Sequence, residues 1–208
     1  LSLASIGADI EMRRTYHAQD GFDGPFGPGW STAYFIQAIT TKNGGQTQVL
    51  VRMDDGTRMT FNQQPDGSFS PAQAWDAVLT QNGGLYQLAT LNGNTYSFNA
   101  NGWLASKTDR AGNVHSVTYT PEGRVSQVLD ASGRGISFSY TAGGKVNQMQ
   151  DHTSRAWTYS YNGDGFLSQA TDPAGQSLTY TYDASGNLTR VLGEDGQILH
   201  QVAYNPVD

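Results

Sequence analysis

The second half of the chain alternates large apolar residues with small hydroxylated ones. The large residues of one parity are, in three successive runs, Ile136, Phe138 and Tyr140; Trp157, Tyr159 and Tyr161; Leu178, Tyr180 and Tyr182. Ser or Thr occupies the positions between them. A period of two is typical of β-strands whose two faces meet different surroundings. The pattern therefore predicts strands with one solvated face and one aromatic face that has to be covered.

A repeat of 21 residues organises these strands. Its aromatic anchors are Phe98, Tyr119, Tyr140, Tyr161 and Tyr182, followed after 22 residues by Tyr204. Four residues after each of the first five anchors stands a glycine: Gly102, Gly123, Gly144, Gly165 and Gly186. Such a period indicates one supersecondary unit that stacks on its neighbours. Each unit has room for two strands of about six residues and two turns, so we expect an antiparallel sheet of stacked β-hairpins.

The second turn of each unit has its own signature. Eleven residues after the anchors stand Asp109, Asp130, Asp151 and Asp172, whereas Gly193 takes the fifth place. A glycine follows each of these positions by three residues, except that Ser154 replaces it once. An aspartate can accept a hydrogen bond from the backbone two residues on, and glycine tolerates the left-handed conformation. These segments are predicted to be tight hairpin turns.

The first half keeps the strand chemistry and loses the period. We divide the chain into residues 1–97, with diverged hairpins, and residues 98–208, with about five regular units, and expect the two parts to be continuous. Two hairpin-like pieces lie at 53–61 and 91–98. The segment 70–82 is the one helix candidate, because Ser70 could cap it and Trp75, Val78 and Leu79 would share a face. A strand over 77–81 is the competing interpretation.

Composition narrows the function classes. The formal net charge is −6, and the 12 Lys and Arg residues are scattered singly, so we expect no nucleic-acid partner. There is no cysteine, which excludes disulfides and thiolate metal sites. No apolar run approaches the ~20 residues of a membrane span, and the first residues lack a signal-peptide pattern. Either the protein is soluble or its targeting segment lies outside this chain.

No constellation of catalytic or metal-binding residues stands out. The four histidines, His17, His115, His152 and His200, are far apart in sequence, and no Ser, His and Asp set has a nucleophile context. His115 and His200 fall at equivalent repeat positions, which favours packing over ligation. The acidic turns match neither an EF-hand nor a calcium β-roll. We therefore expect no enzyme activity, no metal and no cofactor.

Several motifs resemble a known family. The stretches 182–191 (YDASGNLTRV), 98–104 (FNANGWL) and 161–167 (YNGDGFL) look like the Tyr-Asp (YD) repeat of bacterial Rhs proteins, insecticidal Tc toxin C components and teneurins. The stretches 14–16 (RTY) and 24–30 (GPFGPGW) look like the segment that precedes the repeats in Rhs and related wall-associated polymorphic toxins. The residues of this N-terminal motif are Tyr16, Gly24, Pro25, Phe26, Gly27, Gly29 and Trp30.

The resemblance implies an all-β fold, a spiralling antiparallel β-sheet that forms a partial shell or an open spiral. In full-length relatives such a sheet winds into a hollow shell around a C-terminal toxin domain. It implies a non-enzymatic scaffold from a secreted or cell-surface bacterial protein, whose partner is the remainder of its polypeptide or a C-terminal toxin domain. Known shells use many more repeats, and no toxin domain is recognisable here. The stretch Asp172-Pro173-Ala174-Gly175 is similar to part of a self-cleaving aspartate segment, but Asp172 holds an ordinary turn position.

Two further hypotheses concern partners. Repeats of about 20 residues rich in aromatic residues also build carbohydrate or cell-wall binding modules, and Trp157 and Tyr159 are the best candidates for stacking on a glycan. Only one of the five units has such a cluster, which favours the scaffold. An open sheet has two free strand edges, which invite pairing with another chain, so we also expect a homodimer through these edges.

Overall fold

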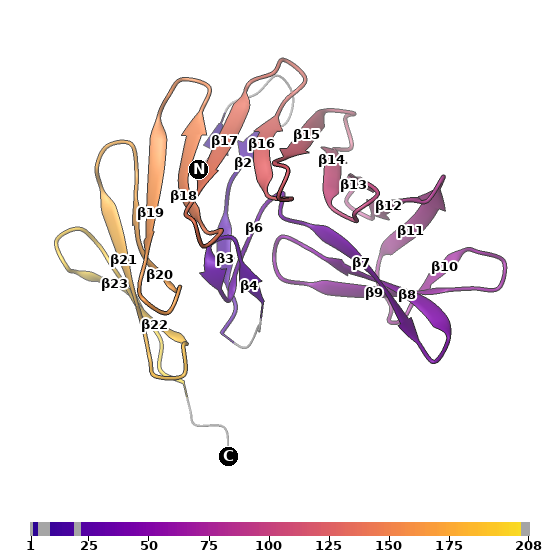
Figure 1. Cartoon of the computed structure of the whole chain (residues 1–208), viewed down its shortest axis with the longest axis horizontal. Helices are drawn as coiled ribbons and strands as arrows, with labels where there is room; N and C mark the ends of the chain where they lie inside the picture. Colours follow the sequence, from indigo (N-terminus) through magenta and orange to yellow (C-terminus); the bar gives the residue numbers. More distant parts are fainter. Residues whose placement is uncertain (1, 4–8, 19–21, 205–208) are drawn as a thin grey trace. The chain divides into compact units, whose positions relative to one another are not determined.

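The computed structural model describes residues 2–3, 9–18 and 22–204, and within them the chain is all β (Figure 1). The chain forms two compact units. Unit 1 consists of Leu1–Arg13 and Thr32–Gly135, and unit 2 consists of Arg14–Ser31 and Ile136–Asp208. The N-terminal stretch is thus divided between the units.

Unit 1 contains two series of antiparallel strands. The first is a four-stranded sheet in the order β10-β9-β8-β7, with bounds β7 (Gln37–Asn43), β8 (Gln46–Arg52), β9 (Arg58–Gln63) and β10 (Phe69–Pro71). The second comprises β11 (Ala77–Asn82), β12 (Leu85–Thr90), β13 (Thr95–Phe98), β14 (Leu104–Thr108), β15 (Val114–Tyr119) and β16 (Val125–Leu129). Each strand of the second series pairs with the next one in sequence. A short pair, β1 (Ser2–Leu3) and β2 (Ile10–Glu11), completes the unit.

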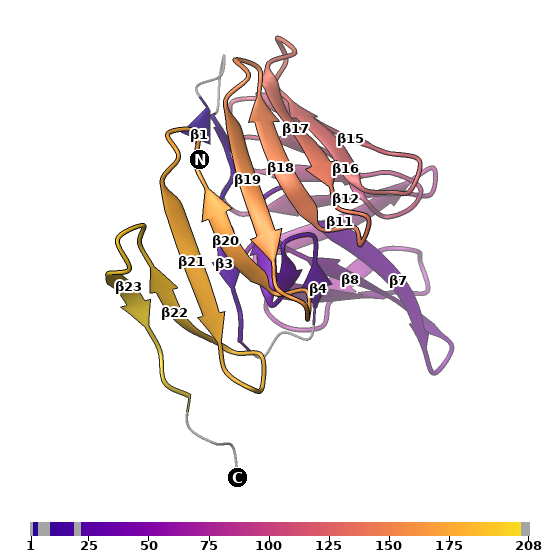
Figure 2. The same cartoon turned by 60° about the vertical axis from the view of Figure 1, so that its left-hand side comes forward.

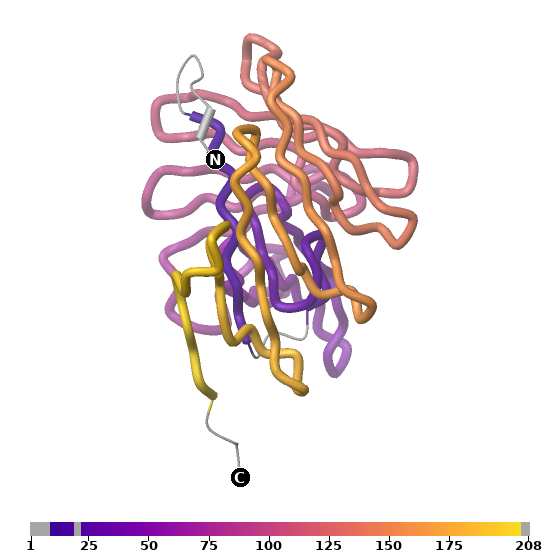
Figure 3. The backbone as a smooth tube through the Cα atoms, turned by 90° about the vertical axis from the view of Figure 1, so that its left-hand side faces the viewer, coloured from indigo at the N-terminus to yellow at the C-terminus, as the bar shows by residue number. Residues whose placement is uncertain are grey.

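Unit 2 continues the hairpin pattern. Its strands are β17 (Gly135–Tyr140, of which Gly135 belongs to unit 1), β18 (Val146–Asp151), β19 (Ala156–Tyr161), β20 (Leu167–Thr171), β21 (Ser177–Tyr182), β22 (Leu188–Leu192) and β23 (Ile198–Gln201). Consecutive strands pair antiparallel, and among the described residues β23 pairs only with β22 (Figure 2). The backbone trace returns beside itself hairpin after hairpin from orange to yellow (Figure 3). The predicted open antiparallel sheet of hairpins is confirmed.

The N-terminal motif supplies four short strands. These are β3 (Arg14–Tyr16), β4 (Asp23–Gly24), β5 (Gly27–Pro28) and β6 (Trp30–Thr32, of which Thr32 belongs to unit 1). Strand β4 pairs with β5, and β3 with β6. We call the unit 2 part of this stretch, Arg14–Ser31, the lead segment.

The burial of the strands follows the predicted parity. In β19, Tyr159 is buried while Thr158 and Ser160 on the other face are exposed. In β15, His115 and Val117 are buried and Thr118 is exposed. At the anchors the register shifts by one residue, as between Ser160 and Tyr161, and such a bulge increases the local twist.

The turns have the predicted chemistry. In the turn that begins at Asp109, the side-chain Oδ1 accepts the backbone N–H of Ala111 at 2.9 Å and of Asn113 at 2.8 Å. In six further turns the side-chain Oδ1 of the first residue accepts the backbone N–H groups two and four residues later. These first residues are Asn99, Asp130, Asp151, Asn162, Asp172 and Asp183. The glycine of each turn has a positive φ, and Ser154, which replaces it once, has a φ of 67°.

The helix considered for 70–82 is not formed. Strand β10 ends at Pro71 and β11 begins at Ala77, so the strand interpretation of 77–81 holds. Within β11, Leu79 is buried while Val78 is 60% exposed. Burial thus alternates with a period of two, and pairing with β12 overrides the helical pattern of the sequence.

Candidate functional site: the aromatic face of the repeat strands

Four of the repeat tyrosines tie their hairpin to the preceding one. The Tyr161 hydroxyl donates a hydrogen bond to the backbone oxygen of Val146 at 2.7 Å. The equivalent bonds run from Tyr119 to Leu104 at 2.8 Å, from Tyr182 to Leu167 at 2.9 Å and from Tyr204 to Leu188 at 3.0 Å. We call this series the hydroxyl ladder. Phe98, the first anchor, is buried and has no hydroxyl to contribute.

Strand pairing explains why these carbonyls accept. Between β18 and β19 the pairing covers Gln148–Gln150 and Ala156–Thr158, so Val146 lies beyond it. Its oxygen takes the Tyr161 hydroxyl, and its N–H donates to the Pro25 oxygen at 2.8 Å. A buried backbone group without a partner is costly, and both groups of Val146 are satisfied.

Burial extends the pH range over which these hydroxyls stay protonated. It raises the pKa of Tyr119, Tyr161 and Tyr182 well above the ordinary tyrosine value. Burial also raises the pKa of Tyr159 to about 12, while the positive charge of Arg14 acts in the opposite direction. The tyrosines therefore remain hydrogen-bond donors at neutral pH.

In unit 2 the lead segment covers the aromatic face. Arg14 lies among four rings, with its guanidinium carbon 4.9 Å from the ring centroid of Tyr159 and 5.6 to 5.7 Å from those of Phe26, Trp30 and Tyr180. Its Nη2 donates to the Tyr180 hydroxyl at 3.1 Å. Nη1 is buried without a hydrogen-bond partner among the described residues. Ring faces attract cations, so they provide the electrostatic partner of this guanidinium.

Further contacts join the lead segment to the hairpins. The Trp30 indole N–H donates to the Tyr182 hydroxyl at 3.0 Å, and its ring packs edge-on against Tyr180 at 5.3 Å. The Tyr16 hydroxyl accepts the N–H of Leu188 and donates to the oxygen of Gly186, each at 3.0 Å. The Lys145 ammonium pairs with Asp23. These contacts bring together residues more than 100 positions apart in sequence.

The glycines of the N-terminal motif permit this close approach. A Cβ on Gly27 would lie 2.8 Å from the oxygen of Gly165, and its φ is +95°. A Cβ on Gly29 would lie 2.7 Å from the Tyr16 ring, and one on Gly24 would lie 2.6 Å from the Trp30 oxygen. No other residue type fits these three positions without displacing a neighbour.

The repeat glycines Gly102, Gly123, Gly144, Gly165 and Gly186 all lie in turns with positive φ. Gly102 also meets a neighbour, because a Cβ there would lie 2.0 Å from the oxygen of Ala38. The Gly102 oxygen in turn accepts the N–H of Ala38 at 2.8 Å.

Tyr140, the remaining aromatic anchor in unit 2, is half-buried at the end of β17.

The two residues proposed to stack on a ligand differ in exposure. Tyr159 is 7% exposed, and its ring contacts Phe26 at 4.9 Å. Trp157 is half-buried beneath the Arg155 guanidinium, 5.8 Å from its ring centroid. Both line a cavity of about 280 Å³ beside Arg14. In this structure Tyr159 offers no open ring face.

Unit 1 has its own buried polar contact. Tyr34 has a φ of 67°, and its hydroxyl lies 2.8 Å from Nδ1 of His115. The Lys107 ammonium lies 6.0 Å from the Tyr34 ring centroid. His115 thus packs at an inward position as expected, whereas His200 is exposed. The sequence does not indicate Tyr34, nor Arg14 as a half-buried cation among aromatic rings. The signal available for Arg14 is a charged residue close to an aromatic, glycine-rich motif.

The described residues show no group of three or more His, Cys, Asp or Glu side chains that could hold a metal. Within the same residues there is no helix long and apolar enough to cross a membrane.

Comparisons with known proteins find two matching family models and several similar relatives. Residues 98–134 and 161–198 match the RHS repeat family model, and residues 1–61 match a domain of unknown function, DUF6531. The chain is 29% identical over 126 residues to the tRNA nuclease WapA of Bacillus subtilis and to the tRNA3(Ser)-specific nuclease WapA of Bacillus spizizenii. This alignment covers 60% of the chain and 5% of each relative.

Solved structures similar to the chain include TcdB2-TccC3 and TcdB2-TccC3-Cdc42. Their TM-scores are 0.37 and 0.38 at 15% sequence identity, covering 79% of this chain and 12% of theirs.

Proposed function

Since this chain is an Rhs-type YD-repeat protein, we propose that it is a non-enzymatic structural scaffold, one section of a β-sheet wall that encloses a C-terminal toxin or effector in an exported bacterial polypeptide. The hydroxyl ladder carries the proposal. Each tyrosine of the ladder joins two successive hairpins through a protonated hydroxyl, and three of the four side chains are half-buried. The sheet can therefore extend by adding similar units. Such a design forms a surface rather than a reaction centre.

The chemistry of the face supports a passive role. Its buried side chains are mainly apolar or aromatic, as with Val117, Met149, Tyr159 and Tyr180. An enzyme site requires convergent polar groups with perturbed acidity. In unit 2 the hydroxyls of Tyr161, Tyr180 and Tyr182 are engaged by the ladder and by the lead segment.

The proposed partner is the remainder of the polypeptide or a toxin domain that follows the chain. A second copy is the other partner that we propose, through the free edge of β23. Ile198 and Leu199 at this edge are 54% and 50% exposed, and an exposed strand edge with apolar side chains favours pairing. Sedimentation at rising concentration tests the second partner.

Enclosure is tested with a polypeptide in which an effector domain follows this chain. Limited proteolysis would compare it with the same polypeptide lacking residues 1–208. We expect the effector to be cut more slowly when the chain is present, because a wall restricts access of the protease. Equal rates of cleavage would contradict the proposal.

Carbohydrate binding by the repeat face is the alternative, and Trp157 at the 280 Å³ cavity is the observation that favours it. Acrylamide quenching of tryptophan emission, with and without a panel of cell-wall glycans, separates the two functions. Under the scaffold proposal the glycans leave quenching unchanged. Suppression by one glycan that is lost in Trp157→Ala would favour the alternative.

A further inference from the structure

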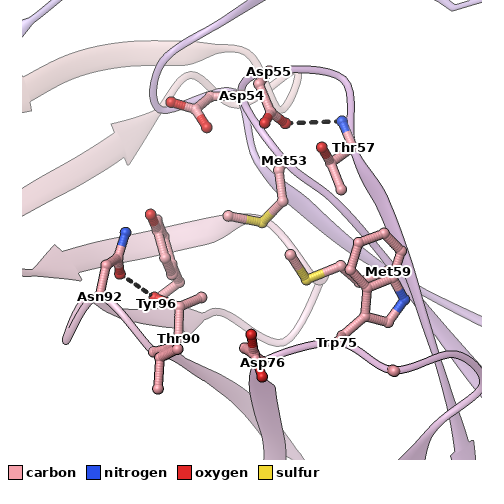
Figure 4. A pocket seen from close by; sticks show the side chains of 12 residues that line it. Met53, Asp54, Asp55, Thr57, Met59, Trp75, Asp76, Thr90, Asn92 and Tyr96 are labelled. Carbon is pink, nitrogen blue, oxygen red and sulfur yellow. Dashed lines mark hydrogen bonds between the residues drawn. The ribbon is translucent and has the colours of Figure 1, made fainter.

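Unit 1 contains a cavity that the scaffold role does not use. It has a volume of about 720 Å³, within the usual range of ligand sites. Three segments border it: the turn between β8 and β9, the residues before β11, and the turn between β12 and β13 (Figure 4). We call it the β8–β13 cavity.

The floor of this cavity is apolar and adaptable. Met53 and Tyr96 are buried, and Met59 and Trp75 are half-buried beside them. Thioethers are polarizable and fit irregular aliphatic chains. An indole ring attracts a cation to its face. This floor suits a side chain that has an aliphatic stem and a positive end.

The rim of the cavity is acidic. Asp54, Asp55 and Asp76 line it, and its lining includes no Lys or Arg. Figure 4 shows Asp54 and Asp55 on one side of the two methionines and Asp76 on the other. At the floor, burial raises the pKa of Tyr96, and the charges of Asp54 and Asp55 raise it further. One cation lies near this ring, because the Lys107 ammonium is 5.9 Å from its centroid; the three carboxylates of the rim outnumber it.

The geometry points to a basic peptide as the ligand. We propose that the β8–β13 cavity binds an extended segment that carries Lys or Arg side chains, with the charged ends at Asp54 and Asp76 and the stems on Met53, Met59 and Trp75. Peptide binding at this site does not depend on the proposed function, that is, on whether the sheet encloses a polypeptide.

Two other ligand classes fit less well. A neutral glycan could donate hydroxyl hydrogen bonds to the three carboxylates, but it would leave their charges without a cationic partner, which a Lys or Arg side chain supplies. A divalent cation needs a convergent set of oxygen ligands, and the described residues show no such group of three. Charge complementarity thus selects the basic peptide.

The test measures binding of acetyl-Gly-Arg-Gly-Arg-Gly-amide to the whole chain by calorimetry, with the matching Gln peptide as control. The Arg peptide should bind and the Gln peptide should not. Added salt should weaken binding, because exposed charges are screened. Trp75→Phe should remove the change in tryptophan emission that accompanies binding.

A pair of variants with equal charge changes isolates the site. Asp54→Asn with Asp76→Asn should weaken binding about tenfold, whereas Asp164→Asn with Glu194→Gln, at exposed positions of unit 2, should change it less than about twofold. All four positions lie at the surface or the rim, and circular dichroism would verify folding.

Three outcomes would overturn the proposal. Equal weakening by both variant pairs would show that binding depends on the net charge of the protein and not on this cavity. An unchanged emission signal in Trp75→Phe would place the peptide elsewhere. Tighter binding of a chitosan oligosaccharide or of Ca²⁺ that Asp54→Asn with Asp76→Asn abolishes would assign the cavity to another ligand class.

Discussion

Strands β21 and β23 carry the same repeat signals and differ in how they are covered. Tyr182 and Tyr204 both donate their hydroxyls to a leucine carbonyl of the preceding unit. Around β21, Trp30 contacts both Tyr180 and Tyr182, whereas every residue of β23 is exposed and Tyr204 is 37% exposed. The repeat therefore supplies the connection between hairpins, and the lead segment supplies the burial.

The largest effect is expected from removing the two tyrosines in turn. Tyr182→Ala should lower the free energy of unfolding by about 3 kcal/mol, because a packed ring and two hydrogen bonds are lost. Tyr204→Ala should cost less than about 1 kcal/mol, since its ring is only partly covered. Denaturant titration measures both. Equal losses would show that the lead segment does not add to the stability that the repeat contacts provide.

The Arg14 cation is the next contact to remove. Arg14→Gln should destabilise the protein by about 2 kcal/mol, because a cation enclosed by rings and one hydrogen bond are lost. Arg190→Gln, at an exposed position of β22, makes the same charge change and should stay within about 0.5 kcal/mol. If both variants unfold at the same denaturant concentration, the aromatic surroundings of Arg14 contribute nothing.

A smaller effect, of opposite sign, is expected at the turn before β19. Ser154→Gly should stabilise the protein by about 1 kcal/mol, because Ser154 has a φ of 67° that glycine adopts without strain. Gly133→Ser, at the equivalent position with a φ of 75°, should destabilise it by a similar amount. Thermal melts of both variants give the comparison, and a loss of stability in Ser154→Gly would refute the explanation.

The last prediction concerns pH. Hydrogen bonds from Thr153 and Arg155 outweigh the desolvation by burial and lower the pKa of Asp151 to about 2. Its folded-state pKa is below the unfolded one, so its stabilisation is present above about pH 4 and is lost as the pH falls toward about 2. The melting temperature of the wild type should fall more steeply over this range than that of Asp151→Asn. Parallel curves would exclude this contribution.

Local pattern was sufficient to predict much of the fold. The alternation around Tyr159 and the Asp109-type turns depend on residues within one hairpin, and both have the expected geometry. The segment 70–82 shows the limit, because Leu79 satisfies a helical and a strand pattern equally and pairing with β12 decides between them.

The site was less accessible to sequence reasoning. The lead segment meets its partners across large separations, as Arg14 does with Tyr180 and Trp30 with Tyr182. A motif shows which residues are unusual and not which distant rings they contact. The β8–β13 cavity was missed for the same reason, since Met53, Trp75 and Tyr96 come from three separate turns and strands.

The hydroxyl ladder also has a direction, and this bears on how the chain is made. Each of its four tyrosines donates backward, to a carbonyl that precedes it by 15 or 16 residues. During synthesis from the N-terminus, each new hairpin thus finds its acceptor already in place and can dock as it leaves the ribosome. The lead segment precedes its partners in the order of synthesis: Tyr16 is made first, and its partner Leu188 is added 172 residues later. On this order of synthesis, the hairpins would pair one after another, and the contacts between Tyr16 and Leu188 would form last.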